Sequence, residues 1–381
     1  MTKVNLKIDK PIQLIELFAG IGSQAKALER LGANFEHYRI CEFDKYAIKS
    51  YNAIHGTDFV TSDITKITAS DLGIVDTDQY CYILTYSFPC QDLSLAGKQK
   101  GMAKGENTRS GLLWEVERLL NECDELPQIL LMENVTQVHG TKNREHFDEW
   151  IAFLESKGYS NYWKDLNAKN FGIPQNRNRT FMVSVLGDYT YEFPQEFPLE
   201  LRLKDMLEDE VDEKYYLSDK MLKGMMNTNF EQYKLENKLK DTSGNADTIV
   251  ARFDGCPQLV KDKVLVKEAT KQGYKEAYEG DGINISSRMK YQRGNVRPNS
   301  CQTLTCSGGN DRGVVVSDAH KLRIRKLTPK ECWRLMGFDD ADFEKAGAEI
   351  SNTQLYKQAG NSIVVDVLYY IFRNMLGGQE Y

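Results

Sequence analysis

The sequence predicts an α/β protein, with a doubly wound, mostly parallel sheet and a smaller, irregular, β-rich second domain. Short apolar runs alternate with amphipathic stretches over the N-terminal half, which is typical of repeated βαβ units. After about residue 194 the chain becomes polar and rich in Lys, Asp, Asn and Gly, and from residue 327 the helical pattern returns. We therefore expect a main domain over 1–194, completed by helices within 327–381, and a second domain over 195–326.

The expected elements follow from apolar periodicity and from residues that start or stop helices. Ser23 and Asp44 are placed to cap two helices, and Gly158 to close another. Thr328 with Pro329 is a helix start, because Pro fits the first helical turn. Strands are expected at 14–18, 38–43, 80–86, 129–135 and 180–185, and helices at 23–30, 45–54, 112–123 and 147–157.

Composition narrows the class of protein. The chain has 381 residues, of which 41% are hydrophobic and 27% charged, as in ordinary soluble globular proteins. It contains no apolar run long enough to span a membrane, and its N-terminus lacks the apolar core of a signal peptide. The eight cysteines form no CxxC pair, so we expect reduced thiols in a cytoplasm and no metal site.

Charge is distributed unevenly, although the net charge of −6 gives no overall sign of a nucleic-acid partner. Residues 286–326 hold nine Lys and Arg but only two acidic side chains, whereas 205–213 hold six acidic ones. Such segregation suits one anion-facing surface. A solvated basic face would explain the basic segment equally well.

A glycine-containing turn, Phe18-Ala19-Gly20-Ile21-Gly22, separates the first strand from the first helix. Glycines at this place let the backbone approach a ligand closely, but a G-x-G pair alone is a weak signal. Glu42 ends the second strand, where a carboxylate can accept hydrogen bonds from ribose hydroxyls. Because the third glycine of the dinucleotide pattern is missing, a nucleoside without a pyrophosphate fits better. Phe43, Asp63 and Ile64 strengthen this interpretation.

A thiol and a carboxylate follow two apolar strands. Cys90 comes after the strand at 80–86, within Ser87-Phe88-Pro89-Cys90-Gln91, and Glu133 ends the strand at 129–135. Ligand sites of open α/β sheets lie at the carboxyl ends of their strands, so both side chains should face one cleft. Arg177 and Arg179 lie two residues apart, which places them on one face of a strand. We expect them to raise the thiolate fraction of Cys90. An inert packed cysteine and an ordinary surface carboxylate are the alternatives.

Taken together, these motifs resemble those of the bacterial-type DNA cytosine-5 methyltransferase family, nearly from end to end. The glycine turn is similar to the family's methyl-donor loop, and residues 87–91 to its nucleophile motif, in which Ser87 replaces the usual Gly. Further similar segments are Glu133-Asn134-Val135, Gln175 to Arg179, Arg325 to Cys332, Met336-Gly337-Phe338 and Gly360-Asn361-Ser362.

The resemblance implies S-adenosylmethionine as methyl donor, no metal, and an attack by Cys90 on C6 of a cytosine that has left the duplex. Glu133 would hold or protonate N3, Arg179 would bind O2, and Arg177 would orient Glu133 or phosphate. The donor site would comprise Phe18, Gly20, Gly22, Glu42, Phe43, Asp63, Ile64, Pro89, Asn361 and Ser362.

Double-stranded DNA is the implied partner, and 195–326 would be the target-recognition domain, with Thr303-Leu304 as the family's Thr-Leu pair. Residues 91–109 would form a mobile catalytic loop. The implied protein is a monomer of bacterial or phage origin, and any cognate restriction endonuclease would be a separate chain. The expected DNA contacts are Gln91, Lys98, Lys100, Arg109, Arg288, Tyr291, Gln292, Arg293, Arg297, Thr303 and Leu304.

Three other functions were weighed against this one. A tRNA cytosine-5 methyltransferase shares the catalytic motifs, but its Cys-Phe-Thr signature is absent and 195–300 is larger than that enzyme requires. A catalytically inactive DNA-binding homologue would not need Cys90, Glu133 and Arg179. A nicotinamide-dependent oxidoreductase would require the missing glycine and would leave Pro89-Cys90 unexplained.

Overall fold

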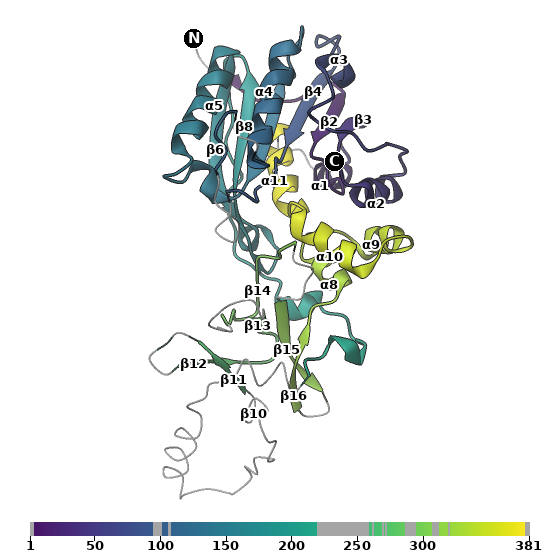
Figure 1. Cartoon of the computed structure of the whole chain (residues 1–381), viewed down its shortest axis with the longest axis vertical. Helices are drawn as coiled ribbons and strands as arrows, with labels where there is room; N and C mark the ends of the chain where they lie inside the picture. Colours follow the sequence, from purple (N-terminus) through teal and green to yellow (C-terminus); the bar gives the residue numbers. More distant parts are fainter. Residues whose placement is uncertain are drawn as a thin grey trace, which may run out of the picture.

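The computed structural model describes residues 4–93, 101–105, 108–218, 259–260, 263–268, 270, 273–285, 295–306, 312–318 and 321–377. Figure 1 shows a sheet with helices on both faces, a group of C-terminal helices below it, and a β-rich part beyond them. The expected fold class, a mostly parallel α/β sheet with a smaller β-rich part, is confirmed. Among the described helices, none has the length and apolar character that a membrane crossing requires.

The central sheet has six strands, of which only β8 runs against the others. β5 and β6 therefore point the same way, with β8 between them. Two adjacent parallel strands, β4 and β5, carry the segments that the sequence singled out. The strand order is β3 (Phe35–Cys41), β2 (Ile12–Leu17), β4 (Cys81–Tyr86), β5 (Ile129–Asn134), β8 (Asn178–Leu186) and β6 (Tyr159–Asn167).

Alternating strand residues build two cores, one on each face of the sheet. Leu14 and Ile83 join a core with α1 (Ser23–Arg30) and α11 (Val365–Met375). Their neighbours Ile15 and Leu84 join the opposite core with α4 (Leu113–Glu122) and α5 (Arg144–Ser156). The two-residue period of a strand thus buries apolar side chains on both faces, as parallel sheets require.

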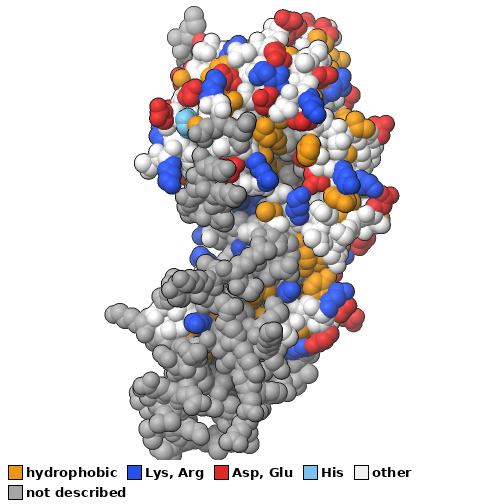
Figure 2. All heavy atoms as spheres, viewed as in Figure 1, with side chains coloured by type: hydrophobic (Ala, Val, Ile, Leu, Met, Phe, Trp, Pro, Cys, Tyr) orange, Lys and Arg blue, Asp and Glu red, His pale blue; other side chains and the backbone are white. Residues whose placement is uncertain are grey.

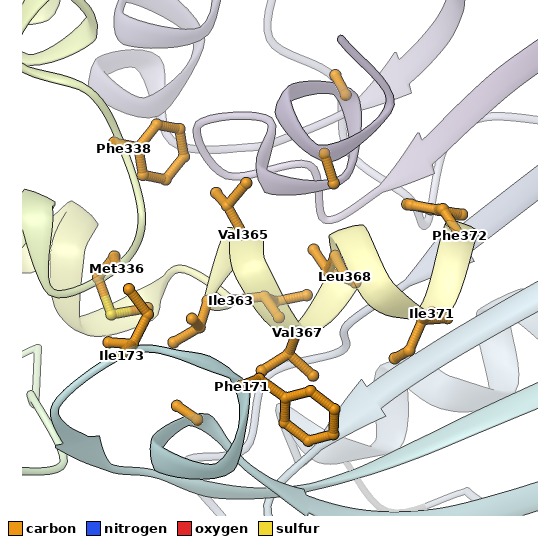
Figure 3. Packing of buried hydrophobic residues seen from close by; sticks show 14 of the residues in the cluster. Phe171, Ile173, Met336, Phe338, Ile363, Val365, Val367, Leu368, Ile371 and Phe372 are labelled. Carbon is orange, nitrogen blue, oxygen red and sulfur yellow. The ribbon is translucent and has the colours of Figure 1, made fainter. Parts of the chain in front are cut away.

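The C-terminal segment completes the first of these cores. Figure 3 shows Val365 and Leu368 on one side of α11, while Val367 lies beside Phe171 on the other. α1 packs against α11, although more than 330 residues of chain separate them. The preceding helices are α8 (Pro329–Arg334), α9 (Asp340–Gly347) and α10 (Asn352–Asn361), and α9 packs against α2 (Lys45–His55).

The β-rich part contains two small antiparallel sheets with a core of their own. One sheet has the order β13 (Gly282–Asn284), β15 (Arg312–Asp318) and β16 (Lys321–Lys326). The other has the order β10 (Leu259–Val260), β11 (Lys263–Lys267) and β12 (Tyr274–Ala277). Val264, Ile283 and Ile324 belong to one apolar cluster between them. This separate core supports the division of the chain into 1–194 with 327–381 and 195–326, which we keep as a proposal.

Short elements fill the remaining connections. Two two-stranded parallel pairs are β1 (Val4–Asn5) with β9 (Tyr189–Thr190), and β7 (Gln175–Asn176) with β14 (Cys301–Gln302). The short helices are α3 (Ala69–Leu72), η1 (Ser110–Leu112), η2 (Thr136–His139), η3 (Ala168–Phe171), η4 (Leu203–Met206) and η5 (Glu213–Tyr215).

Two details of the expected elements were wrong. Ser23 does not cap α1: the cap residue is Gly22, whose backbone is left-handed (φ 81°, ψ 45°), and Ser23 is the first helical residue. β6 was not expected, because its sequence mixes polar and apolar residues without a clear pattern. It lies at the edge of the sheet, where a strand is half-exposed. By contrast, Asp44 caps α2 by accepting a hydrogen bond from Tyr46 N, and Thr328 caps α8 in a reciprocal box with Glu331.

Candidate active site

The nucleophile segment leaves the sheet beside the Glu133 segment. β4 and β5 are parallel neighbours with Tyr86 opposite Met132, so the residues after them emerge at one edge. Asn134 Nδ2 donates a hydrogen bond of 2.9 Å to Phe88 O, which ties the two segments together. Ser110 Oγ donates one of 2.7 Å to Pro89 O from the other side. The turn that carries Cys90 is therefore held by two side chains. Asn134 belongs to the Glu133-Asn134-Val135 motif, whereas nothing in the sequence pointed to Ser110.

Glu133 meets an arginine from the next strand. β8 runs antiparallel to β5 with Thr180 opposite Asn134, which brings Arg179 to the end of β5. Arg179 Nε lies 3.2 Å from Glu133 Oε1. Burial raises the pKa of the Glu133 carboxyl above its ordinary value, although the two arginines, Arg179 and Arg177, act in the opposite direction. A raised pKa favours the protonated form of a carboxyl, from which a proton can be given to a nucleobase.

The Cys90 thiol is half-buried at this edge. Burial, followed by the negative charge of Glu133, raises its pKa, while Arg179 and Arg177 act to lower it. The arginines act in the direction expected from the sequence, which is to favour the thiolate of Cys90. Desolvation of the charged form outweighs them, so the pKa of the thiol lies above its ordinary value.

Arg177 lies in a different environment from Arg179. Its Nη1 donates to Leu304 O at 3.0 Å, and its Nη2 donates to Ser362 O at 2.7 Å and Gly360 O at 3.1 Å. Burial is the main cause that lowers its pKa to about 9. The guanidinium thus joins three segments of chain. Its described hydrogen bonds go to carbonyls rather than to the Glu133 carboxylate that it was expected to orient.

The glycine turn after β2 is built around Glu42. Gly20 N donates a hydrogen bond of 2.9 Å to Glu42 Oε2, and Asp44 N donates one of 2.7 Å to Oε1. Phe18, Gly20 and Gly22 have positive φ values of 59°, 58° and 81°. For Phe18 this conformation is strained, and such strain gathers at functional sites. The Glu42 carboxylate therefore holds the turn through two backbone N–H groups, in addition to the burial of Ile21.

The surroundings of this turn suit a nucleoside. A Cβ added at Gly20 would meet no atom within 4 Å, so the space over that residue is open. Phe43, directly after Glu42, is 78% exposed, which offers an aromatic face to a planar base. Ile64 is buried, and Asp63 Oδ1 accepts hydrogen bonds from Thr65 N at 3.1 Å and from Thr65 Oγ1 at 2.8 Å.

The C-terminal Gly-Asn-Ser segment lies at the end of α10. Asn361 is the last residue of that helix and is exposed. Ser362 is buried, and its Oγ donates a hydrogen bond of 2.8 Å to Gln358 O. Gln358 Nε2 in turn donates to Tyr46 O on α2 at 2.9 Å, which ties α10 to the element that follows Glu42. This link gives a physical reason for the two distant motifs to occur together.

The expected DNA contacts lie only partly within the described residues. Gln91 and Arg109 are both described, and Arg109 Nη1 donates to Gln91 Oε1. Thr303 Oγ1 donates to Asn176 O at 2.7 Å, and Leu304 N donates to Gln175 Oε1 at 3.0 Å. Arg297 pairs through its backbone with Gly282. Lys98, Lys100, Arg288, Tyr291, Gln292 and Arg293 lie outside the described residues.

The basic segment of the sequence is only partly a surface. Arg325 is 2% exposed and forms an ion pair with Glu331, so it cannot belong to an anion-facing patch. Arg323 pairs with Glu213 and lies over the ring of Tyr216, 3.7 Å from its centroid. Figure 2 shows Lys and Arg mixed with acidic side chains over the described part of this face. The count of charged residues in the sequence therefore predicted a larger basic surface than the described residues form.

Gln175 is a further residue that the sequence analysis did not single out. Its Nε2 donates a hydrogen bond of 2.8 Å to Leu335 O, while its Oε1 accepts from Leu304 N. It therefore joins the main domain to the α8 end and to the residues after β14. The signal was present, because Gln175 is the first residue of the Gln-x-Arg-x-Arg motif, but no local pattern indicates such distant partners.

Comparisons with known proteins show the family to which the chain belongs. The family model for C-5 cytosine-specific DNA methylase matches residues 12–377. Type II methyltransferase M2.ScrFI of Lactococcus lactis subsp. cremoris is 30% identical, over 97% of this chain and 100% of the relative. Orphan methyltransferase M.SssI of Spiroplasma monobiae is 31% identical, over 99% of this chain and 100% of the relative.

Solved structures show the same fold at lower identity. The Dnmt2 methyltransferase of S. pombe has a TM-score of 0.62 and 19% identity, covering 97% of this chain and 99% of its own. The Entamoeba histolytica methyltransferase EhMeth has a TM-score of 0.65 and 18% identity over the same shares. From the match of the family model over nearly the whole length, together with these relatives, the chain belongs to the C-5 cytosine-specific DNA methylase family.

Proposed function

We propose that this DNA (cytosine-5-)-methyltransferase uses Cys90, Glu133 and Arg179 to methylate a cytosine that has been flipped out of duplex DNA, with S-adenosylmethionine as donor. The observation that supports this assignment best is the meeting of these three side chains at one edge of the sheet. Glu133 and Arg179 are in contact there, and both act on the pKa of Cys90. A nucleophile, a proton donor and a cation within reach of one another suit addition to a polar ring.

The chemistry divides among these groups. The C6 atom of cytosine is inaccessible within the stack, so the base has to leave the duplex. The Cys90 thiol gives its proton to solvent, and its sulfur then forms a bond to C6. The electron pair of the C5–C6 double bond shifts to C4–C5, and the negative charge develops on N3. Glu133 delivers a proton to N3, which stabilises that charge, while Arg179 binds O2. Elimination later removes the C5 proton, reforms the double bond, releases Cys90 and returns the N3 proton to Glu133.

The donor is assigned to the glycine turn. Gly20 and Gly22 would approach it through their backbone, Glu42 would accept from its ribose hydroxyls, and Phe43 would stack on its adenine. Asp63 and Ile64 would contact the adenine edge, with Phe18, Pro89, Asn361 and Ser362 around them. When bound, the donor supplies an electrophilic methyl group to the activated C5.

The β-rich part, within 195–326, is assigned to recognition of a short DNA sequence. Arg177 supports this division of labour, because it joins Leu304 of that part to the Gly360–Ser362 segment. The role that we assign to Arg177 is to hold the recognition part in position over the catalytic edge, the edge of the sheet where Cys90, Glu133 and Arg179 meet. Gln91, Arg109, Arg297, Thr303 and Leu304, with the six residues outside the described set, remain the proposed DNA contacts.

The function is tested by incubating the purified protein with labelled S-adenosylmethionine and unmethylated plasmid, followed by bisulfite sequencing. The expected result is 5-methylcytosine at one short motif. Incorporation into tRNA instead of plasmid would favour the RNA methyltransferase. The absence of label from both substrates, with retained DNA binding, would identify a catalytically inactive homologue.

Replacing Glu42 tests the donor site. In Glu42→Gln the single amide oxygen can still accept a hydrogen bond from one of the two backbone donors, Gly20 N or Asp44 N. The amide NH₂ then faces the other of these N–H groups, which loses its acceptor. We expect the glycine turn to shift and the affinity for S-adenosylhomocysteine to fall roughly tenfold or more, since hydrogen bonds to a charged group are strong. Isothermal titration calorimetry measures the change.

A matched control for Glu42 lies on the surface. Glu349 is exposed and forms only an exposed ion pair with Lys49 at 3.4 Å. Glu349→Gln removes the same charge and should leave the affinity unchanged. Equal affinities for wild type and Glu42→Gln would remove Glu42 from the donor site.

A further inference from the structure

A cluster of titratable side chains contacts the glycine turn through His55. His55 Nδ1 lies 2.6 Å from Glu29 Oε1, and His55 Nε2 lies 3.2 Å from Ile21 O, the carbonyl between the two glycines of the turn. The His55 side chain has no exposed surface. A Cβ added at Gly22 would lie 2.3 Å from His55 Nε2, so ring and turn are in direct contact.

The hydrogen bonds define the protonation of the ring. Both ring nitrogens of His55 face acceptors, a carboxylate and a carbonyl, and only the imidazolium donates from both nitrogens. A protonated Glu29 would be the alternative. However, although burial is the largest single cause and acts to raise the pKa of Glu29, the hydrogen bond and charge of His55, together with Lys26 and His37, hold that pKa below its ordinary value. Glu29 is therefore the carboxylate and His55 the cation.

The spacing fits a hydrogen bond better than a shared metal ion. Two ligand atoms of one tetrahedral zinc ion lie more than ~3 Å apart, because each is about 2 Å from the metal. His55 Nδ1 and Glu29 Oε1 are closer than that. His37, the third member of the cluster, directs Nδ1 to Tyr51 Oη at 3.0 Å, and its Nε2 is 3.6 Å from Glu29 Oε1.

The surrounding groups favour a cation at His55. Burial lowers the pKa of His37 to about 4, so His37 is neutral near pH 7 and does not compete for the proton. Burial raises the pKa of Glu16 to about 7, and the negative charge that Glu16 gains as pH rises attracts the imidazolium. The titratable groups that face the cluster are Glu16 from β2, Lys26 and Glu29 from α1, His37 from β3, Tyr51 from α2 and Lys345 from α9.

We propose that His55, as an imidazolium held by Glu29, is a positioning residue that fixes the Ile21 carbonyl and thereby the glycine turn in its donor-binding conformation. The proposal rests on the assignment of this turn to the methyl donor. Without a donor at the place of Nε2, the Ile21 carbonyl loses this hydrogen bond, and the glycine turn is no longer fixed in that conformation.

Two substitutions separate the contact from the charge. In His55→Gln the side-chain NH₂ takes the place of Nε2–H and can still donate to Ile21 O. In His55→Asn the shorter amide reaches only the place of Nδ1. We expect His55→Asn to weaken S-adenosylhomocysteine binding roughly tenfold and to raise the donor KM equally, with kcat at saturating donor within twofold. His55→Gln should recover most of the affinity.

The separation of the donor KM from kcat and the recovery in His55→Gln are readouts that a merely structural role would not change. Affinity for S-adenosylhomocysteine is measured by calorimetry. Glu29→Gln removes the carboxylate that holds His55 Nδ1, so it should also weaken this binding. His146→Asn is the matched control, because His146 lies on α5, which packs against β6 at the other end of the sheet.

The possible failures are distinguishable. If wild-type protein does not bind S-adenosylhomocysteine at any pH, the donor assignment itself is wrong. If wild type binds, but His55→Asn, His55→Gln and Glu29→Gln share its affinity and donor KM, His55 has no positioning role. A loss of affinity in both His55 variants with an unfolding midpoint lowered equally would also overturn the proposal, because Gln would then not have restored the contact.

Discussion

Cys90→Ala should abolish methylation while leaving DNA binding intact. The substitution removes the only atom that can form the bond to C6, and loss of a nucleophile typically costs roughly 10⁴-fold or more in rate. The methyl side chain fits a half-buried site at the end of β4, so the fold should be unaffected. Radiolabel transfer to plasmid measures the rate, and gel-shift titration measures DNA affinity.

A matched thiol shows whether the loss is specific. Cys123 is a half-buried free cysteine that follows α4, away from the catalytic edge. Cys123→Ala should retain activity within about twofold.

Duplex DNA with 5-fluorocytosine at the target position adds a direct test, since fluorine cannot leave C5 as a proton does. Wild type and Cys123→Ala should form a denaturation-resistant complex with it, and Cys90→Ala should not. Turnover by Cys90→Ala would eliminate the proposed nucleophile.

The raised pKa of Cys90 gives this reaction a defined pH dependence. Ionisation of the thiol becomes more favourable as pH rises, so single-turnover methylation should accelerate with pH. The carboxyl of Glu133 also has a raised pKa, and loss of its proton removes the donor to N3 at higher pH. The two trends oppose each other and should give a bell-shaped profile. In Glu133→Gln the descending limb should disappear and the rate should be low throughout.

The sequence was sufficient to predict these groups because their placement follows from local patterns. Cys90 and Glu133 each follow an apolar run, and parallel strands bring such ends to one edge. The prediction for Glu42 also followed from its place at the end of an expected strand. The separation of Arg177 from Arg179 could not be predicted, because β7 ends before Arg177 and β8 begins after it. The two-residue rule applies only within one strand.

Contacts between distant elements were beyond the reach of sequence patterns. Glu29 and His55 lie on different helices, and neither belongs to a recognisable motif. Arg325 was counted with a basic surface, because a charge count cannot show that β16 ends inside the protein. The capping pattern after it was correct, but that pattern gave no sign that Glu331 also receives the arginine. The second large effect that we expect arises from this pair.

Glu331→Gln should destabilise the fold by about 3 kcal/mol or more, the usual cost of removing one partner of a buried ion pair. Arg325 Nη2 and Nη1 donate to Glu331 Oε1 and Oε2 at 2.6 and 2.8 Å, and the Glu331 side chain is 0% exposed. The same carboxylate accepts from Thr328 N at 2.8 Å and Glu208 N at 2.9 Å. With a neutral amide in its place, the guanidinium is left buried without a counter-charge.

Urea unfolding followed by circular dichroism measures this loss, and an exposed pair provides the control. Glu213 also accepts from an arginine, Arg323, but it is largely exposed, so Glu213→Gln should cost less than about 1 kcal/mol. Arg325→Met combined with Glu331→Gln should be more stable than Glu331→Gln alone, because the double variant no longer buries an unpaired cation. Equal losses for Glu331→Gln and Glu213→Gln would contradict the buried pair. A strong pair at this junction would mean that β16, α8 and the segment at Glu208 unfold together, since the carboxylate bonds to all three.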